Sequence, residues 1–251
     1  MKARYSAALM MAVAALLAVS APVYASKMDD RIESSARKSY VFKTFLKEDD
    51  IKIESRDGAV TLTGIVSHEY HKEMAQETMA GLPGVKSVDN KLEFKGERPA
   101  EKSDAWITAK IKTTLLFHRS VSAVTEVNTT DGIVTLQGEA NNQAQKDLTT
   151  EYAKDVEGVK DVKNEMTVSK TAKKTHRTTG DKIDDASITA QVKTALLFHR
   201  STSALNTKVE TTHGVVTLSG KAKNAAEKDL VTKLVDDIKG VKSVQNRMTI
   251  E

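Results

Sequence analysis

The chain has 251 residues, of which 39% are hydrophobic and 29% are charged. It carries 38 Lys and Arg against 34 Asp and Glu, so the net charge of +4 gives it no global basic character, and we expect no nucleic-acid partner. The absence of cysteine excludes disulfides, thiol catalysis and Cys-ligated zinc, so stability has to come from apolar cores.

The first residues have the pattern of a secretory signal peptide. Lys2 and Arg4 precede an uncharged, mostly apolar run over 5–20, and Pro22 and a small-residue exit at Ala25 follow. The apolar run is too short to predict a membrane span, although an uncleaved anchor is the alternative. We therefore expect cleavage after Ala25 and a periplasmic protein.

Three copies of one unit follow, and two sequence lines recur in each at the same spacing. The first line is DGAVTLTG (57–64), DGIVTLQG (131–138) and HGVVTLSG (213–220). The second line is GVKSVDNKLEF (84–94), GVKDVKNEMTV (158–168) and GVKSVQNRMTI (240–250). The repeat divides the chain into a signal peptide (1–25), copy 1 (27–96), copy 2 (101–170), a basic flexible linker (171–181) and copy 3 (182–251).

Each copy begins with an amphipathic helix. In copy 2, Ile107, Ile111 and Leu115 recur every four residues, as one buried helical stripe does. Asp104 and Asp185 stand three residues before the stripes of copies 2 and 3, and we expect them to be N-caps. In copy 1 the matching stripe is Ile32, Ala36 and Tyr40.

A β-hairpin, a second helix and a last strand follow in each copy. Two alternating runs meet at an Asp-Gly or His-Gly pair, which predicts a tight turn with positive φ, and His213 is expected to be a turn residue. The fold class is therefore α+β, with three tandem α-β-β-α-β domains, each with two helices on a three-stranded mixed sheet. We expect structural roles for glycines at the hairpin turn (Gly58, Gly132, Gly214), at the end of the first sequence line (Gly64, Gly138, Gly220), and at C′ of the second helix (Gly84, Gly158, Gly240).

One asparagine recurs among the apolar residues of the last strand, as Asn90, Asn164 and Asn246. A polar side chain in this position needs hydrogen-bond partners. We expect a structural tie to a turn or a helix end, and a ligand role is the alternative.

The helix start DxxITA (104–109 and 185–190), the hairpin line and the GVKSV or GVKDV line together resemble the BON domain. The resemblance covers nearly all of the chain after the signal peptide, and copy 1 departs from it most. It implies a non-enzymatic envelope protein of the osmotic stress response that binds anionic phospholipid surfaces. A periplasmic chaperone or adaptor for unfolded proteins is the alternative that it also implies.

The hexapeptide LLFHRS occurs at 115–120 and again at 196–201. We expect it in the last turn of the first helix, where its cationic side chains would face the negative end of the helix dipole. Adjacent residues on a helix point to different sides, so His118, Arg119 and Ser120 cannot form a nucleophile and base among themselves. Recent duplication is the simplest reason for the two near-identical segments.

Two features are candidates for lipid or partner binding. Trp106, beside Lys110, is the only tryptophan, and it could sit at a headgroup layer or pack on its own or a neighbouring domain. The linker could hold an anionic surface or be a plain tether. The basic residues counted with it are Lys170, at its junction with copy 2, and Lys173, Lys174 and Arg177.

Metal and cofactor chemistry have no support in the sequence. His68 and His71 have a spacing that could hold a metal, but no third ligand is evident. There is no Gly-rich phosphate loop and no nucleophile elbow. We therefore expect no metal, no cofactor and no catalytic site, and the sequence does not indicate an oligomeric state.

Overall fold

A computed structural model describes residues 27–96, 100–121, 125–169, 183–199, 201–202 and 206–251. The chain divides into two compact units after Lys95, and each is described separately. The first unit holds copy 1, and the second holds copies 2 and 3. The predicted signal peptide and the whole of the predicted linker (171–181), with Lys173, Lys174, Arg177 and the adjoining Lys170, lie outside the described residues.

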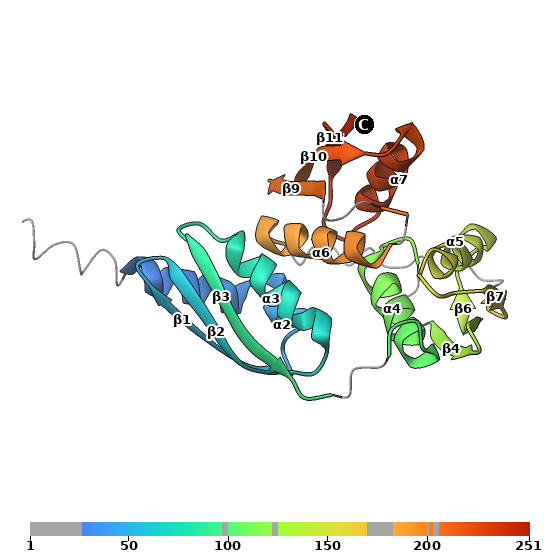
Figure 1. The fold of residues 1–251 in the computed structure, drawn as a ribbon, viewed down its shortest axis with the longest axis horizontal. Helices are drawn as coiled ribbons and strands as arrows, with labels where there is room; N and C mark the ends of the chain where they lie inside the picture. Colours follow the sequence, from blue (N-terminus) through green and yellow to red (C-terminus); the bar gives the residue numbers. More distant parts are fainter. Residues whose placement is uncertain (1–26, 97–99, 122–124, 170–182, 200, 203–205) are drawn as a thin grey trace, which may run out of the picture. The chain divides into compact units, whose positions relative to one another are not determined.

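Copy 1 has a three-stranded mixed sheet with helices against one face (Figure 1). Its elements are a helical segment over 27–38, then α2 (Tyr40–Thr44), β1 (Asp50–Arg56), β2 (Ala59–Val66), α3 (Glu69–Ala80) and β3 (Ser87–Phe94). β2 pairs antiparallel with β1 and parallel with β3. In β1 and β2 the buried residues alternate, because only one face of the sheet packs against the helices.

The second unit repeats this order twice (Figure 1). Copy 2 contains α4 (Asp104–Phe117), β4 (Glu126–Thr130), β5 (Ile133–Gln137), β6 (Glu139–Ala140), α5 (Gln143–Lys154), β7 (Asp161–Asn164) and β8 (Thr167–Val168). Copy 3 contains α6 (Asp185–Phe198), β9 (Thr207–Thr212), β10 (Val215–Ala222), α7 (Ala225–Asp236), β11 (Ser243–Asn246) and β12 (Thr249–Ile250). In both copies the two hairpin strands pair antiparallel, β9 with β10 and β4 with β5. The last strand pairs parallel in two short pieces, β11 and β12 with β10 in copy 3, and β7 with β5 and β8 with β6 in copy 2, which confirms the predicted α+β class.

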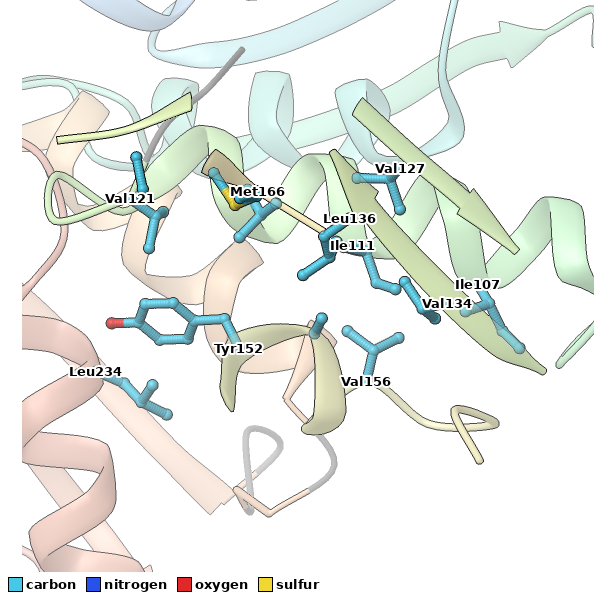
Figure 2. Close-up of a cluster of buried hydrophobic side chains, with 13 residues drawn as sticks. Ile107, Ile111, Val121, Val127, Val134, Leu136, Tyr152, Val156, Met166 and Leu234 are labelled. Atoms are coloured by element: carbon cyan, nitrogen blue, oxygen red, sulfur yellow. The ribbon is translucent and has the colours of Figure 1, made fainter. Parts of the chain in front are cut away.

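The core of copy 2 lies between α4, α5 and the sheet, and Figure 2 shows its side chains. Ile107, Ile111 and Leu115, the predicted stripe, are all buried in it. Burying an aliphatic side chain of this size stabilises a fold by about 1.5–3 kcal/mol. Leu234 joins the same cluster although it belongs to α7 of copy 3, so copies 2 and 3 share part of one core.

The stripe predicted for copy 1 is wrong at its last position. Ile32 and Ala36 are buried, but Tyr40 is only half-buried and Val41 takes the core position. The cause is Ser39, which interrupts the helix. Its hydroxyl donates to the carbonyl of Ala36 at 2.7 Å and accepts from the backbone amide of Phe42 in the next helix, α2. The interruption changes which side chains face the sheet.

Asp104 and Asp185 are not the N-caps that the sequence predicted. Ser103 and Asp184 cap these helices, and Asp104 and Asp185 are the first helical residues. The Asp104 carboxylate instead accepts from the amides of Asp131 and Gly132, both at 2.8 Å. Asp185 and, in copy 1, Asp29 bind their own hairpin turns in the same way. This aspartate therefore ties the start of the first helix to the hairpin turn.

The hairpin turns have the predicted backbone. Asp131 and Gly132 have φ of 53° and 79°, and His213 and Gly214 have 52° and 80°. A two-residue turn with both φ values positive matches the right-handed twist of the strands that it joins. His213 is therefore a turn residue.

The predicted C′ glycines lie beyond the ends of the second helices. These helices end earlier, with Gly81, Asp155 and Asp237 as C-caps in right-handed conformation. Gly158 has φ of 89°, and a Cβ there would lie 3.2 Å from Ile107 Cδ1. Glycine is needed because this turn passes close to the first helix. A short segment therefore follows the second helix of each copy, and in copies 2 and 3 it begins with Asp155 and Asp237.

Candidate functional site

The last turn of the first helix contains only the Leu-Leu-Phe of LLFHRS, and not His118 and His199 as the sequence predicted. α4 ends at Phe117 and α6 at Phe198, and the histidine that follows is a C-cap in extended conformation. The extended backbone turns His118 and His199 inward instead of toward the helix dipole. Their exposed fractions are 0% and 3%.

Each of these histidines pairs with the other copy through its backbone. His118 forms an antiparallel bridge with Ile238, and His199 forms one with Val156. At the first bridge, the amide of Arg119 donates to Asp237 O at 2.9 Å, and the amide of Lys239 donates to Phe117 O at 3.2 Å. The end of the first helix in one copy thus pairs with the end of the second helix in the other.

The side chains make the same kind of reciprocal contact between copies 2 and 3. Ser201 Oγ donates to Asp155 Oδ1 at 2.5 Å, and His199 Nδ1 lies 2.5 Å from Asp155 Oδ2. On the other side, Ser120 Oγ donates to Asp237 Oδ1, and His118 Nδ1 lies 3.3 Å from Asp237 Oδ2 without the alignment of a hydrogen bond. We call this contact the histidine interface. It has the reciprocal character of a two-fold dimer contact, within one chain.

The centre of the histidine interface is a pair of imidazoles. His118 Nε2 and His199 Nε2 lie 3.4 Å apart, and their rings are inclined at 81°. Tyr152 stacks on His118 with centroids 4.0 Å apart, and its hydroxyl donates to Asp237 Oδ2 at 2.7 Å. In Figure 2 the Tyr152 hydroxyl points toward the side of the core where Leu234 lies.

Three side chains of the histidine interface, His118, Asp237 and Tyr152, have perturbed pKa values. Burial lowers the pKa of His118, and the nearby His199 acts in the same direction. Burial opposes ionisation of Asp237, but its contacts with His118, Ser120 and Tyr152 hold its pKa below the ordinary value. Burial, followed by the charge of Asp237, raises the pKa of the Tyr152 hydroxyl. The carboxylate is therefore ionised, and the tyrosine remains a hydrogen-bond donor.

The two halves of the histidine interface are not identical. Arg119 donates to the carbonyl of Val241 at 3.1 Å and to the Asp236 carboxylate at 3.1 Å, while Lys239 Nζ donates to the carbonyl of Leu116 at 2.9 Å. The residue of copy 2 that occupies the position of Asp236 is Lys154, the last residue of its helix. Arg119 would meet a like charge in a pair of two copies 2, so these contacts favour pairing of copy 2 with copy 3.

Copy 1 lacks both halves of this arrangement. It has FLKEDD (45–50) after its first helices and Gly81 at the C-cap of its second helix, so no carboxylate stands there. Its own buried histidine, His71, contacts Asp49 within the same copy at 2.6 Å, and burial lowers the pKa of His71. Sequence reasoning missed the histidine interface, although LLFHRS and the C-cap aspartate occur together in copies 2 and 3 only.

The other predicted site residues have structural contacts. Trp106 is half-buried and packs against the core of copy 2, and Lys110 Nζ lies 5.2 Å from its ring centroid. The same ammonium lies 3.7 Å from the ring centroid of Phe198 in copy 3, a cation–π contact between the copies. Trp106 and Lys110 therefore contribute to packing. For Trp106 this agrees with the expectation that it packs on its own or a neighbouring domain.

The recurring asparagine ties the last strand to the second helix. Asn164 Nδ2 donates to the carbonyl of Lys146 and to Thr150 Oγ1, both at 2.8 Å, and its Oδ1 accepts from the amide of Met166 at 3.0 Å. Asn90 and Asn246 make corresponding bonds in their own copies. The tie is to the body of the helix instead of its end.

Among the described residues, no cluster of three or more His, Asp or Glu side chains has the arrangement of a metal site. The described helices also include none that is long and apolar enough to span a bilayer.

The chain belongs to the BON-domain family, because the BON domain model matches residues 28–96, 103–170 and 184–251. This match confirms the resemblance that the repeated lines predicted. The chain is 35% identical over 143 residues to the osmotically-inducible protein Y of Escherichia coli, covering 55% of this chain and 71% of that protein. It is 33% identical over 161 residues to the outer membrane lipoprotein DolP of Haemophilus influenzae, covering 64% of this chain and 74% of that protein.

A solved structure of CdsD, a structural protein of the type III secretion system of Chlamydia trachomatis, also matches. The match covers 84% of this chain and 90% of that one, at 17% identity and a TM-score of 0.25. A likeness at that score does not bear on function.

Proposed function

We propose that this protein is a non-enzymatic envelope protein of the osmotic or envelope stress response, exported to the periplasm, and that it binds anionic phospholipid surfaces. The observation that supports this most is the match of the BON domain to three stretches that cover nearly all of the chain beyond residue 27. The names of two relatives, an osmotically inducible protein and an outer membrane lipoprotein, agree with an envelope role.

Weak lipid sites on linked domains act together. Copies 2 and 3 are joined by the histidine interface, so a surface that binds one of them brings the other close at no further cost in ordering. The basic linker between them adds Lys170, Lys173, Lys174 and Arg177, and each basic group near an anionic surface contributes about 1 kcal/mol. We place the first lipid contact at this linker instead of at Trp106, whose ring is partly used in packing.

The test is co-sedimentation of the mature protein with vesicles. We expect binding to vesicles that contain phosphatidylglycerol, weaker binding as salt is raised, and none to pure phosphatidylcholine vesicles. Changing the four basic linker residues to Gln should weaken the binding. The matched control changes four exposed lysines of the folded copies to Gln, namely Lys47, Lys52, Lys163 and Lys221.

Absence of pelleting at low salt would contradict the proposal. The function to test next is then the chaperone or adaptor role, measured as protection of an unfolded client from aggregation without lipid. Equal loss of binding in the linker variant and in its control would still support lipid binding, but it would contradict the placement of the first lipid contact at the linker.

A further inference from the structure

We propose that His118 and His199 form a buried proton-binding site, and that copies 2 and 3 stay paired only while a single proton lies between the two Nε2 atoms. The site makes the pairing of the two copies sensitive to acid. This inference concerns the histidine interface alone and does not depend on lipid binding.

The geometry of the two rings limits the number of protons. His199 Nδ1 is held by Asp155, so its Nε2 is the atom that faces His118. A hydrogen bond between two nitrogens needs one donor and one acceptor, and this is met when one Nε2 carries a proton and the other does not. With the Nε2 atoms 3.4 Å apart, two N–H groups would bring their hydrogens to about 1.4 Å from each other. The closed interface therefore has no room for the second proton.

The surrounding charges favour the same state. A carboxylate only accepts, so the hydrogen of the His199–Asp155 contact lies on Nδ1 of His199; with one further hydrogen, on the Nε2 of His118, both rings are neutral. Lys239, beside His118, opposes a positive charge on the His118 ring, and so does the neighbouring His199. The remaining groups that face the pair are the neutral Tyr152 and the guanidinium of Arg119, which lies against Asp236 and Asp237.

Because both rings are buried, solvent does not screen a positive charge that forms on them.

The direction of the pH effect follows from His118. Burial lowers its pKa below the ordinary value of 6.5, which it regains when the copies separate and water reaches the ring. Between these two pKa values the separated state binds more protons than the paired state. Pairing is therefore fully stabilised above about pH 6.5 and is lost as the pH falls through the lower pKa of His118.

Amide hydrogen exchange of the full chain tests this directly. The amides of Arg119 and Lys239 donate across the interface, whereas those of Lys160 and Lys242 make backbone bonds within copies 2 and 3. After correction for intrinsic exchange, we expect the first two to lose protection by about tenfold per pH unit below pH 6.5. The last two should keep theirs. Equal behaviour of all four amides, whether all stable or all lost together, would overturn the proposal.

A variant removes the titrating group. In His118→Gln the side-chain amide can still donate to His199 Nε2 but takes up no proton in this range. Protection of Arg119 and Lys239 should then no longer change between about pH 7.5 and about pH 5. A loss of protection as steep as in the wild type would overturn the assignment to this pair. If the variant does not pair even at the higher pH, the wild-type comparison decides by itself.

Discussion

His118 and His199 face each other with their Nε2 atoms 3.4 Å apart, although they lie 81 residues apart in the chain. Each stands directly after the first helix of its copy, and each is bridged to the segment after the second helix of the other. The repeated LLFHRS therefore has a structural role in the contact between copies 2 and 3. Its two occurrences are the two halves of one contact.

Replacing Asp237 with Asn should weaken the second unit. Asp237 accepts from Ser120 and Tyr152 and lies beside His118, and its side chain is only 12% exposed. We expect Asp237→Asn to lower the free energy of unfolding by about 1.5–3 kcal/mol, the usual value for a hydrogen bond to a charged group. Denaturation can be followed by the fluorescence of Trp106, which is the only tryptophan and lies in this unit.

The matched control is the neighbouring Asp236→Asn. The Asp236 side chain is 55% exposed and makes a surface contact with Arg119, so we expect a change of about 1 kcal/mol or less. Equal effects of the two substitutions would contradict the importance assigned to Asp237.

Tyr152 contributes both a ring and a hydroxyl. Tyr152→Phe removes the bond to Asp237 but retains the ring that stacks on His118, and we expect a loss of about 1 kcal/mol. Leu234 occupies the position of Tyr152 in copy 3, so leucine is a natural replacement. Tyr152→Leu also removes the stacking on His118 and should cost about 0.5–1.5 kcal/mol more than Tyr152→Phe. A leucine variant as stable as the phenylalanine variant would show that the stacking contributes nothing. Thermal or chemical unfolding of both proteins decides this.

Asn164→Ala should destabilise copy 2, because it leaves the amide of Met166 without the side-chain oxygen that it donates to and removes one of the donors to the carbonyl of Lys146. The expected cost is about 1–3 kcal/mol in free energy of unfolding. Asn128→Ala is the control, since Asn128 is exposed on β4 and should change stability by no more than about 0.5 kcal/mol. If both variants unfold alike, the asparagine does not tie the strand to the helix.

Two glycine substitutions should have opposite signs. Gly214 has φ of 80°, and a Cβ there would lie 3.1 Å from the side chain of Lys242, so Gly214→Ala should cost about 1–2 kcal/mol. Gly81 has φ of −82° in right-handed conformation, and Gly81→Ala should be neutral or should stabilise by about 0.4–1 kcal/mol. Circular dichroism of thermal unfolding measures both. Destabilisation by Gly81→Ala as large as by Gly214→Ala would contradict the turn assignment.

The fold could be predicted from the sequence because its signals are local. The stripe of Ile107, Ile111 and Leu115 and the Asp-Gly turns depend only on periodicity and backbone preference. Helix boundaries were less accurate: Ser103 competes with Asp104 for the N-cap position, and both residue types suit it.

The histidine interface could not be predicted, because it depends on two segments far apart in the sequence meeting in space. LLFHRS was assigned to a helical last turn, and nothing local shows that His118 adopts an extended backbone. The partner, Asp237, was hidden because the second helix was expected to continue to Gly240. Comparing the copies offered one signal: the histidine and the C-cap aspartate are both present in copies 2 and 3, and copy 1 has Gly81.

The most direct test of the account is a distance between copies 2 and 3 in solution. The chain has no cysteine, so spin labels can be attached at Lys163→Cys and Gln245→Cys, two exposed strand positions. At about pH 7.5 the histidine interface predicts one narrow distance distribution, which Asp155→Asn combined with Asp237→Asn broadens. A distribution that is broad from the start, and unchanged by the two substitutions, would contradict the pairing of copies 2 and 3.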